Sequence, residues 1–205
     1  LDGAVIDSSV IGGTTAAAGS FTTLTASSNL SVDGGTIKLD GNYPTGTQNV
    51  ALGDTALDSV ESGGQNNVAI GHNSATALTT GDQNTFVGSL TADAMTTGTD
   101  NTGVGYGALS ALTTANDNTA LGSAALYLNT TGTQNTAVGS AALDANTTSP
   151  YNTAVGYLSL SAQTTSAGYN TAIGWKSMTT NTTVDVSVAV VGNTLFTTTP
   201  EINDT

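Results

Sequence analysis

The chain repeats one short pattern of polar and apolar residues. Each copy opens with Asn, carries an aliphatic residue at its fourth position and closes with Gly at its fifth. The copies begin at Asn49, Asn67, Asn84, Asn101, Asn118, Asn135, Asn152 and Asn170. Successive motif glycines lie 17 or 18 residues apart. A fixed period of this length is typical of a solenoid, in which each repeat forms one coil stacked on the next. The sequence therefore predicts an all-β, parallel β-roll or β-solenoid with 17–18-residue coils.

The motif itself predicts a short strand with two different sides. Successive side chains of a strand alternate, so the second and fourth positions should face one way and the third the other. Because the fourth position is aliphatic in every copy, we predict that it forms the interior row of the coil. Glycine at the fifth position suits a corner where a Cβ atom would obstruct the chain. The predicted structural core is Leu52, Ile70, Val87, Val104, Leu121, Val138, Val155 and Ile173.

A second apolar row follows at positions eight and nine. Two copies weaken it to Ala75 and Ala92, and the same copies carry Leu78 and Met95 at position twelve, as if volume were conserved in one shared space. A 17-residue coil should be too small to enclose both rows. We therefore predict that the second row faces other copies of the chain, in a closed three-fold assembly. The predicted trimer-interface residues are Leu57, Leu109, Leu126, Leu143, Leu160 and Met178.

Two polar features also recur. Paired threonines follow position twelve, and stacked coils should set one Thr of each pair inside and one outside. The opening asparagines should form a ladder whose amides satisfy backbone groups at the corner.

The period divides the chain into three parts. Residues 1–48 do not follow it and are expected to form a short irregular β segment, the N-terminal linker or connector of a longer fibre. Residues 49–192 are the β-roll, with eight coils and a degenerate ninth at Val188-Ala189-Val190-Val191-Gly192. Residues 193–205 are expected to be a C-terminal cap and tail, with Leu195-Phe196 covering the apolar column. The first residue is not Met, so Leu1 is expected to be internal to a longer polypeptide.

The composition favours ordered repeats over disorder and argues against nucleic acids and anionic membranes as partners. Only 8% of residues are charged, but 38% are hydrophobic and regularly spaced, which argues against disorder. The net charge is −13, with two Lys and no Arg, so no nucleic acid and no anionic membrane surface is expected as a partner. There is no Cys, which excludes disulfides and thiolate metal sites. No apolar run approaches a transmembrane length, so membrane insertion is not expected.

The units 118–134 and 135–151 resemble the "NTAVG..AL..NTTG" repeats of phage tail-fibre-like proteins, which are similar in turn to the heads of trimeric autotransporter adhesins of the YadA type. The resemblance covers residues 49–192. It implies a left-handed homotrimeric β-roll, and a non-catalytic structural fibre segment of a virion that projects a host-attachment surface. The implied partners are the rest of the fibre and a host-surface glycan or protein. The alternative is the head of a bacterial surface adhesin, extracellular or at the cell surface.

The ends of the chain extend this resemblance. Residues 10–25 are similar to linker sequences that are common in phage fibre proteins. Many relatives continue into an intramolecular chaperone that cuts itself off, usually before Ser-Asp. The chain stops at Asn203-Asp204-Thr205, where such a cut could fall, so Thr205 is expected to be the mature C-terminus.

No pattern points to an enzyme, a cofactor or a metal. His72 has no partner pattern for a triad or a metal site. Asp82, Asp100 and Asp117 lie near the opening Asn, which could suggest calcium at corners. The nonapeptide of calcium-binding rolls is missing, so solvated turn acids are the better interpretation.

Aromatic residues are the candidate receptor contacts. Tyr106, Tyr157 and Trp175 share position six, and Tyr127, Tyr151 and Tyr169 lie on neighbouring turns. Such rings can stack on sugars or anchor a protein, but they can also shield coil edges or trimer seams. The candidates for receptor contact are Tyr106, Tyr127, Tyr157 and Trp175. Regular outward rows of Thr can also bind ice, because the stacking distance of the coils approximates a lattice spacing. An ice-binding solenoid is therefore a distant third alternative, after the phage fibre and the bacterial adhesin.

Overall fold

The computed structural model describes residues 48–164, 168–180, 182, 185–190 and 192. The chain divides into two units, Leu1–Ile37 and Lys38–Thr205, and the solenoid described below belongs to the second. The predicted N-terminal connector, the Leu195-Phe196 cap and the predicted mature terminus at Thr205 lie outside the described residues.

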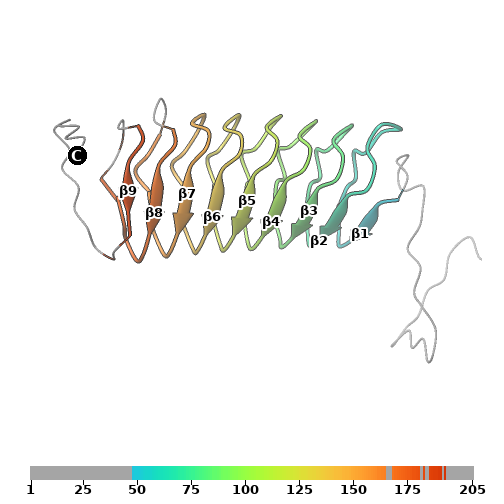
Figure 1. Cartoon of the computed structure of the whole chain (residues 1–205). Helices are drawn as coiled ribbons and strands as arrows, with labels where there is room; N and C mark the ends of the chain where they lie inside the picture. Colours follow the sequence, from blue (N-terminus) through green and yellow to red (C-terminus); the bar gives the residue numbers. More distant parts are fainter. Residues whose placement is uncertain (1–47, 165–167, 181, 183–184, 191, 193–205) are drawn as a thin grey trace, which may run out of the picture. The chain divides into compact units, whose positions relative to one another are not determined.

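The repeats form a parallel β-solenoid, as the period predicts (Figure 1). Within the described residues, nine strands make one sheet in sequence order, one strand per coil, and there is no helix. Neighbouring strands pair in register, for example Thr136 with Thr153. The strands are β1 (Val50–Leu52), β2 (Val68–Ile70), β3 (Thr85–Val87), β4 (Thr102–Val104), β5 (Thr119–Leu121), β6 (Thr136–Val138), β7 (Thr153–Val155), β8 (Thr171–Ile173) and β9 (Val188–Ala189). Strand β9 pairs in parallel with β8 at the predicted ninth motif, which lacks the opening Asn.

Backbone hydrogen bonds join consecutive coils on every side, not only along the sheet. Around the fifth coil, the Gly122 amide donates to Val104 O at 2.8 Å and the Leu126 amide to Ala142 O at 3.0 Å. On the remaining side, the Thr130 amide donates to Thr147 O at 2.8 Å. The coil therefore satisfies its backbone along most of its perimeter, although each strand has at most three residues.

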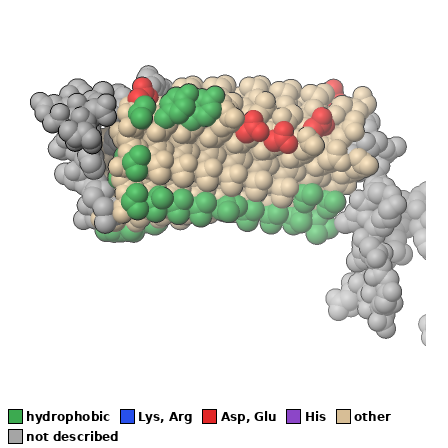
Figure 2. Space-filling view, viewed as in Figure 1, with side chains coloured by type: hydrophobic (Ala, Val, Ile, Leu, Met, Phe, Trp, Pro, Cys, Tyr) green, Lys and Arg blue, Asp and Glu red, His purple; other side chains and the backbone are tan. Residues whose placement is uncertain are grey.

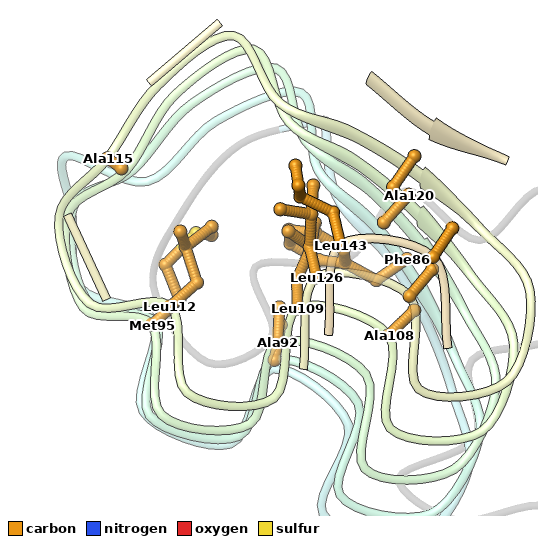
Figure 3. Packing of buried hydrophobic residues seen from close by; sticks show 14 of the residues in the cluster. Phe86, Ala92, Met95, Ala108, Leu109, Leu112, Ala115, Ala120, Leu126 and Leu143 are labelled. Atoms are coloured by element: carbon orange, nitrogen blue, oxygen red, sulfur yellow. The ribbon is translucent and has the colours of Figure 1, made fainter. Parts of the chain in front are cut away.

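The interior is filled by the ninth position of the repeat (Figure 3). Every member of this row is 0–1% exposed, so the prediction that it faces other copies of the chain is wrong. The alanines at the third position, such as Ala120 and Ala137, are also 0% exposed and lie in the same cluster. The residues concerned, hereafter the inner leucine row, are Leu57, Leu109, Leu126, Leu143, Leu160 and Met178.

The fourth position lies on the outside of the coil, so the prediction that it forms the interior is also wrong. Four members are 37–54% exposed, namely Leu52, Val104, Leu121 and Ile173, and the others, Ile70, Val87, Val138 and Val155, are half-buried. We call these eight residues the outer aliphatic row. The alternation of sides along the strand was predicted correctly, but the two sides were assigned in reverse.

Volume explains the reversal. The inner leucine row occupies most of the narrow interior, so the strand can add little more than a methyl group there. The exception supports this reason. The buried Phe86 occupies the third position in the coil where Ala92 replaces the leucine. A Cβ added at Gly103, in the next coil, would lie 3.1 Å from the Phe86 ring and 3.3 Å from Leu109.

Each corner after the strand needs glycine. Gly122 has a φ of +141°, and a Cβ there would lie 2.5 Å from the carbonyl oxygen of Gly139. Apart from Gly107, non-glycine residues occupy the other left-handed positions, including Ala124 (φ 56°), Leu126 (φ 52°) and Gln134 (φ 57°), and the same positions recur in the other coils. Such conformations cost about 1–3 kcal/mol each and persist where the surrounding structure enforces them.

The asparagine ladder is confirmed. The backbone N–H of Asn135 donates to Oδ1 of Asn118 at 3.1 Å, and the side-chain Nδ2 of Asn135 donates to Ser149 O at 2.9 Å. Equivalent bonds run from Asn49 to Asn170, and all eight side chains are buried. The ladder therefore supplies both an acceptor and a donor to the corner backbone.

Candidate assembly face and surface aromatics

The outer face of the sheet carries two straight columns of β-branched and aliphatic side chains. One is the outer aliphatic row, which Figure 2 shows as a continuous hydrophobic band along one edge of the solenoid. The other is the second position, which is Thr from β3 to β8 and Val at Val50, Val68 and Val188. The band has one aliphatic residue in each of the first eight coils, and the exposed Val190 continues it into the ninth.

The strand positions of this face are uncharged along its whole length. None of the strands β1–β9 contains an acid or a base. The described acids lie outside the strands, and Asp54, Asp100 and Asp117 border this face at its two edges. The full set is Asp54, Asp58, Glu61, Asp82, Asp93, Asp100, Asp117, Asp144 and Asp185. In a chain with a net charge of −13, the outer face is therefore where two copies can approach with least electrostatic repulsion.

The acids near the asparagines have structural roles. Oδ1 of Asp82 accepts a hydrogen bond from the backbone N–H of Gln65 at 2.7 Å. In a later coil, Oδ1 of Asn116 accepts the equivalent bond from the backbone N–H of Thr99 at 2.8 Å. Asp100 and Asp117 are exposed residues in left-handed conformation, which Asp tolerates better than most side chains. Over the described ranges, no three His, Asp or Glu residues are grouped so that they could hold a metal ion. His72 is exposed.

One carboxyl group is perturbed. Asp144 is half-buried, and burial raises its pKa, while hydrogen bonds from the backbone at Asp144 and Ala145 oppose the rise. Its Oδ1 atom is buried with no hydrogen-bond partner. Asp144 directly follows the buried Leu143 on the wall of the sixth coil, and Tyr127 holds the same repeat position in the fifth coil.

The four candidate receptor contacts are all exposed, but they do not form one site. Their exposed fractions are 60% for Tyr106, 42% for Tyr127, 49% for Tyr157 and 52% for Trp175. Tyr106 and Tyr127 belong to the fourth and fifth coils, and Tyr157 and Trp175 to the seventh and eighth.

The rings of the last coils make specific contacts that the sequence did not reveal. Tyr151 and Tyr169 stack with centroids 4.7 Å apart and planes inclined by 15°. Nζ of Lys176 lies 4.9 Å from the centroid of Trp175. The signal for the stacked pair was the recurrence of Tyr at one repeat position, since equal positions in successive coils become neighbours. Lys176 directly follows Trp175 in the chain.

The paired threonines form the predicted ladder on a different side of the solenoid. In the five pairs from Thr79-Thr80 to Thr147-Thr148, the first Thr is half-buried, and its hydroxyl donates to the equivalent carbonyl of the next coil, as from Thr113 to Thr130 at 3.0 Å. The second Thr is exposed, in a row formed by Thr80, Thr97, Thr114, Thr131 and Thr148.

Comparison with known proteins gives no family for this chain. No family model, no curated protein and no solved structure matches it. In the described part of the chain there is no helix long and apolar enough to cross a membrane. The function is therefore argued from the geometry of the solenoid and the sequence resemblance.

Proposed function

We propose that this chain is a structural, non-catalytic fibre segment that assembles as a parallel homotrimer and belongs to a phage virion, where it projects a host-attachment surface. The observation that carries the proposal is the uncharged outer face with its unbroken aliphatic row. The resemblance of the repeats to phage tail-fibre-like proteins supplies the setting.

The partner of this face is best supplied by another copy of the chain. Parallel strands repeat about every 4.8 Å, and the outer aliphatic row places one side chain at each repeat. A second copy has the same spacing, so it can meet every coil in the same way. Each half-exposed side chain would bury a modest area at about 25 cal/mol per Å², and many small equal gains would add along the fibre.

The burial of the inner leucine row decides which residues can join the copies. The inner leucine row cannot contact a neighbouring copy, because it is buried within its own coil. The outer aliphatic row takes this role in the proposal. A closed cyclic arrangement buries such a stripe in every copy and avoids an open end.

The test is a single charge in the centre of the face. Val138→Asp in β6 is expected to give a monomer under conditions where the native chain is a trimer, measured by light scattering after size-exclusion chromatography. The circular dichroism spectrum should not change, since Val138 is half-buried on the outside of the coil. Thr131→Asp, at an exposed position outside the strands, is the control and should stay trimeric.

Two results would contradict the proposal. One is a native chain that remains monomeric at all concentrations, and the other is a Val138→Asp variant that assembles like the native chain. A bacterial adhesin head would share the assembly, so the genes around the coding sequence separate the two settings: a downstream self-cleaving chaperone indicates a phage, and a β-barrel anchor indicates a bacterium.

A further inference from the structure

We propose that the seventh and eighth coils lock neighbouring copies together through aromatic side chains on both edges of the outer face. Tyr151 and Tyr169 form one edge, and Tyr157 and Trp175 form the other. The inference rests on the proposed assembly and adds where along the solenoid the copies are held in register.

The evidence is that both edges become aromatic in the same two coils. The edge before the Asn reads Gln48, Asn66, Gln83, Asp100, Asp117, Gln134, Tyr151 and Tyr169. The edge after the Gly reads Asp54, His72, Ser89, Tyr106, Ser123, Ser140, Tyr157 and Trp175. In the first eight coils, aromatic residues occupy both edges only in the last two. Figure 2 shows a hydrophobic patch near this end of the face, separate from the aliphatic band.

The geometry of the rings favours a protein neighbour over a sugar. A sugar stacks on the open face of an aromatic ring, but Tyr151 and Tyr169 cover one face of each other. They remain 43% and 60% exposed, and the stack leaves each ring at most one open face together with its edges. Such edges pack well against other aromatic or aliphatic side chains. Val186, the next residue along this edge, is 75% exposed and offers nothing that binds a sugar hydroxyl.

Charge complementarity supports a second copy as the occupant. A cyclic assembly places one surface of each copy against a different surface of the next. Lys176 follows Trp175 on one edge, and it is the one cation among the described residues. Asp185 precedes Val186 on the other edge, and its Oδ1 accepts a hydrogen bond from the Gly168 amide. One edge is thus aromatic and basic, and the other is aromatic and acidic, at the same end of the solenoid.

Fluorescence of the single tryptophan tests this directly. Trp175 is the only Trp in the chain, so its emission reports on one place. We expect the emission maximum to shift to shorter wavelength in the assembled native chain relative to the Val138→Asp monomer, because the half-exposed indole becomes covered by a neighbouring copy. If the chain assembles but the two emission maxima coincide, the aromatic lock is overturned while the assembly stands. If the native chain never assembles, the proposed function fails instead.

A matched pair of substitutions tests the contribution to assembly. The variant Tyr151→Gln/Tyr169→Gln introduces the residue that Gln83 and Gln134 hold at the same left-handed position, so the coil should still form. We expect its trimer to dissociate about tenfold more readily, measured as the concentration at which light scattering shows dissociation. Tyr106→Ser, which copies Ser89 and Ser123 at a position where the opposite edge is Asp100, is the control and should change this concentration little.

Two outcomes of this pair would overturn the lock. One is an equal effect of the test and control variants. The other is a Tyr151→Gln/Tyr169→Gln variant that assembles normally with native Trp175 emission but loses binding to a glycan array that the native trimer binds. That second result would place the rings against a receptor instead of a neighbouring copy.

Discussion

Two aliphatic rows run side by side through this solenoid and have opposite environments. The inner leucine row is completely buried, and the outer aliphatic row is half-exposed on the other side of the coil wall. Leu126 and Leu121 make the contrast sharp, because the same residue type in one coil is 0% exposed at one position and 37% at the other. Regular recurrence of an apolar residue therefore predicts a row with one common environment. It does not show whether that row lies inside the coil or on its outer face.

The largest expected effect comes from the corner that separates the two rows. Gly122→Ala should prevent stable folding of its coil, at a cost above about 4 kcal/mol, because the Cβ would lie 2.5 Å from Gly139 O at a φ of +141°. Gly107→Ala is the control. Its φ is +64°, the nearest atom would be 3.2 Å away on Tyr127, and Ala124 and Ala141 already occupy this position in later coils. Thermal unfolding followed by circular dichroism compares the two, and equal losses would contradict the role of the corner.

The rows themselves are compared by Leu126→Ala and Leu121→Ala in the Val138→Asp background, where assembly does not contribute. Leu126→Ala should lower the free energy of unfolding by about 2–5 kcal/mol, as expected for a buried cavity. Leu121→Ala should cost less than about 1 kcal/mol there, because its side chain stays partly in water in the single chain. Urea unfolding measures both. The comparison fails if the outer substitution costs as much as the inner one.

A smaller effect tests whether volume decides which side of the strand faces inward. Ala137→Phe in β6 should destabilise the solenoid by about 1–3 kcal/mol through overpacking, since Ala137 is fully buried beside the inner leucine row. Adding Leu143→Ala should recover part of the loss, because the pair then copies Phe86 with Ala92 in the third coil. Urea unfolding of the single and double variants measures the recovery. Additive losses would show that volume is not shared in this way.

The smallest effect concerns the outer wall beside Leu143. Burial raises the folded-state pKa of Asp144, so the folded state holds this proton more tightly than the unfolded chain does. The stability linked to it is present below about pH 4 and is lost as pH rises through the folded pKa. Asp144→Asn should therefore reduce the decline in melting temperature as pH rises above about 4. Asp93→Asn is the control, at the same repeat position, where the carboxylate accepts a hydrogen bond from the Ser110 hydroxyl at 2.6 Å. A decline as steep in Asp144→Asn as in the native chain would contradict the assignment.

Much of the fold could be predicted because it depends on repeated local chemistry. The Asn-to-Gly motif fixed the strand, the corner and the ladder, and each has the same geometry from coil to coil. The environment of position twelve could not be predicted as directly. It is fully buried as Leu78, Met95 and Leu112 in early coils and equally buried as Asn129, Asn146 and Gln163 in later ones.

These buried amides show that polarity is a weak guide to burial when a partner is built into the fold. Nδ2 of Asn129 donates to Gly132 O at 2.8 Å, and its Oδ1 accepts from the Gly132 amide at 3.1 Å. Asn129 thus replaces water with backbone partners three residues away, at little cost. Nδ2 of Asn146 likewise donates to Ser149 O at 3.0 Å, whereas Oε1 of Gln163 accepts from Nδ2 of Asn170 at 3.2 Å. A residue's polarity alone carries no information about whether such partners are in reach.

Only part of the arrangement of the surface aromatic residues could be predicted from the sequence. Repeat spacing placed Tyr157 next to Trp175 and Tyr151 next to Tyr169, because equal positions in stacked coils are neighbours. The left-handed conformations of leucine and alanine were invisible, because these residue types carry no signal for that conformation.

The sequence by itself determined the coil length, the parallel stacking, the glycine corners and the asparagine ladder, since each follows from one residue type recurring at one spacing. Only the tertiary structure decided which aliphatic row is inside. Both rows satisfy the same pattern, and the choice depends on how much volume a narrow coil can hold. The leucines fill that space, so the strand turns alanine inward and keeps its larger side chains on the outer face.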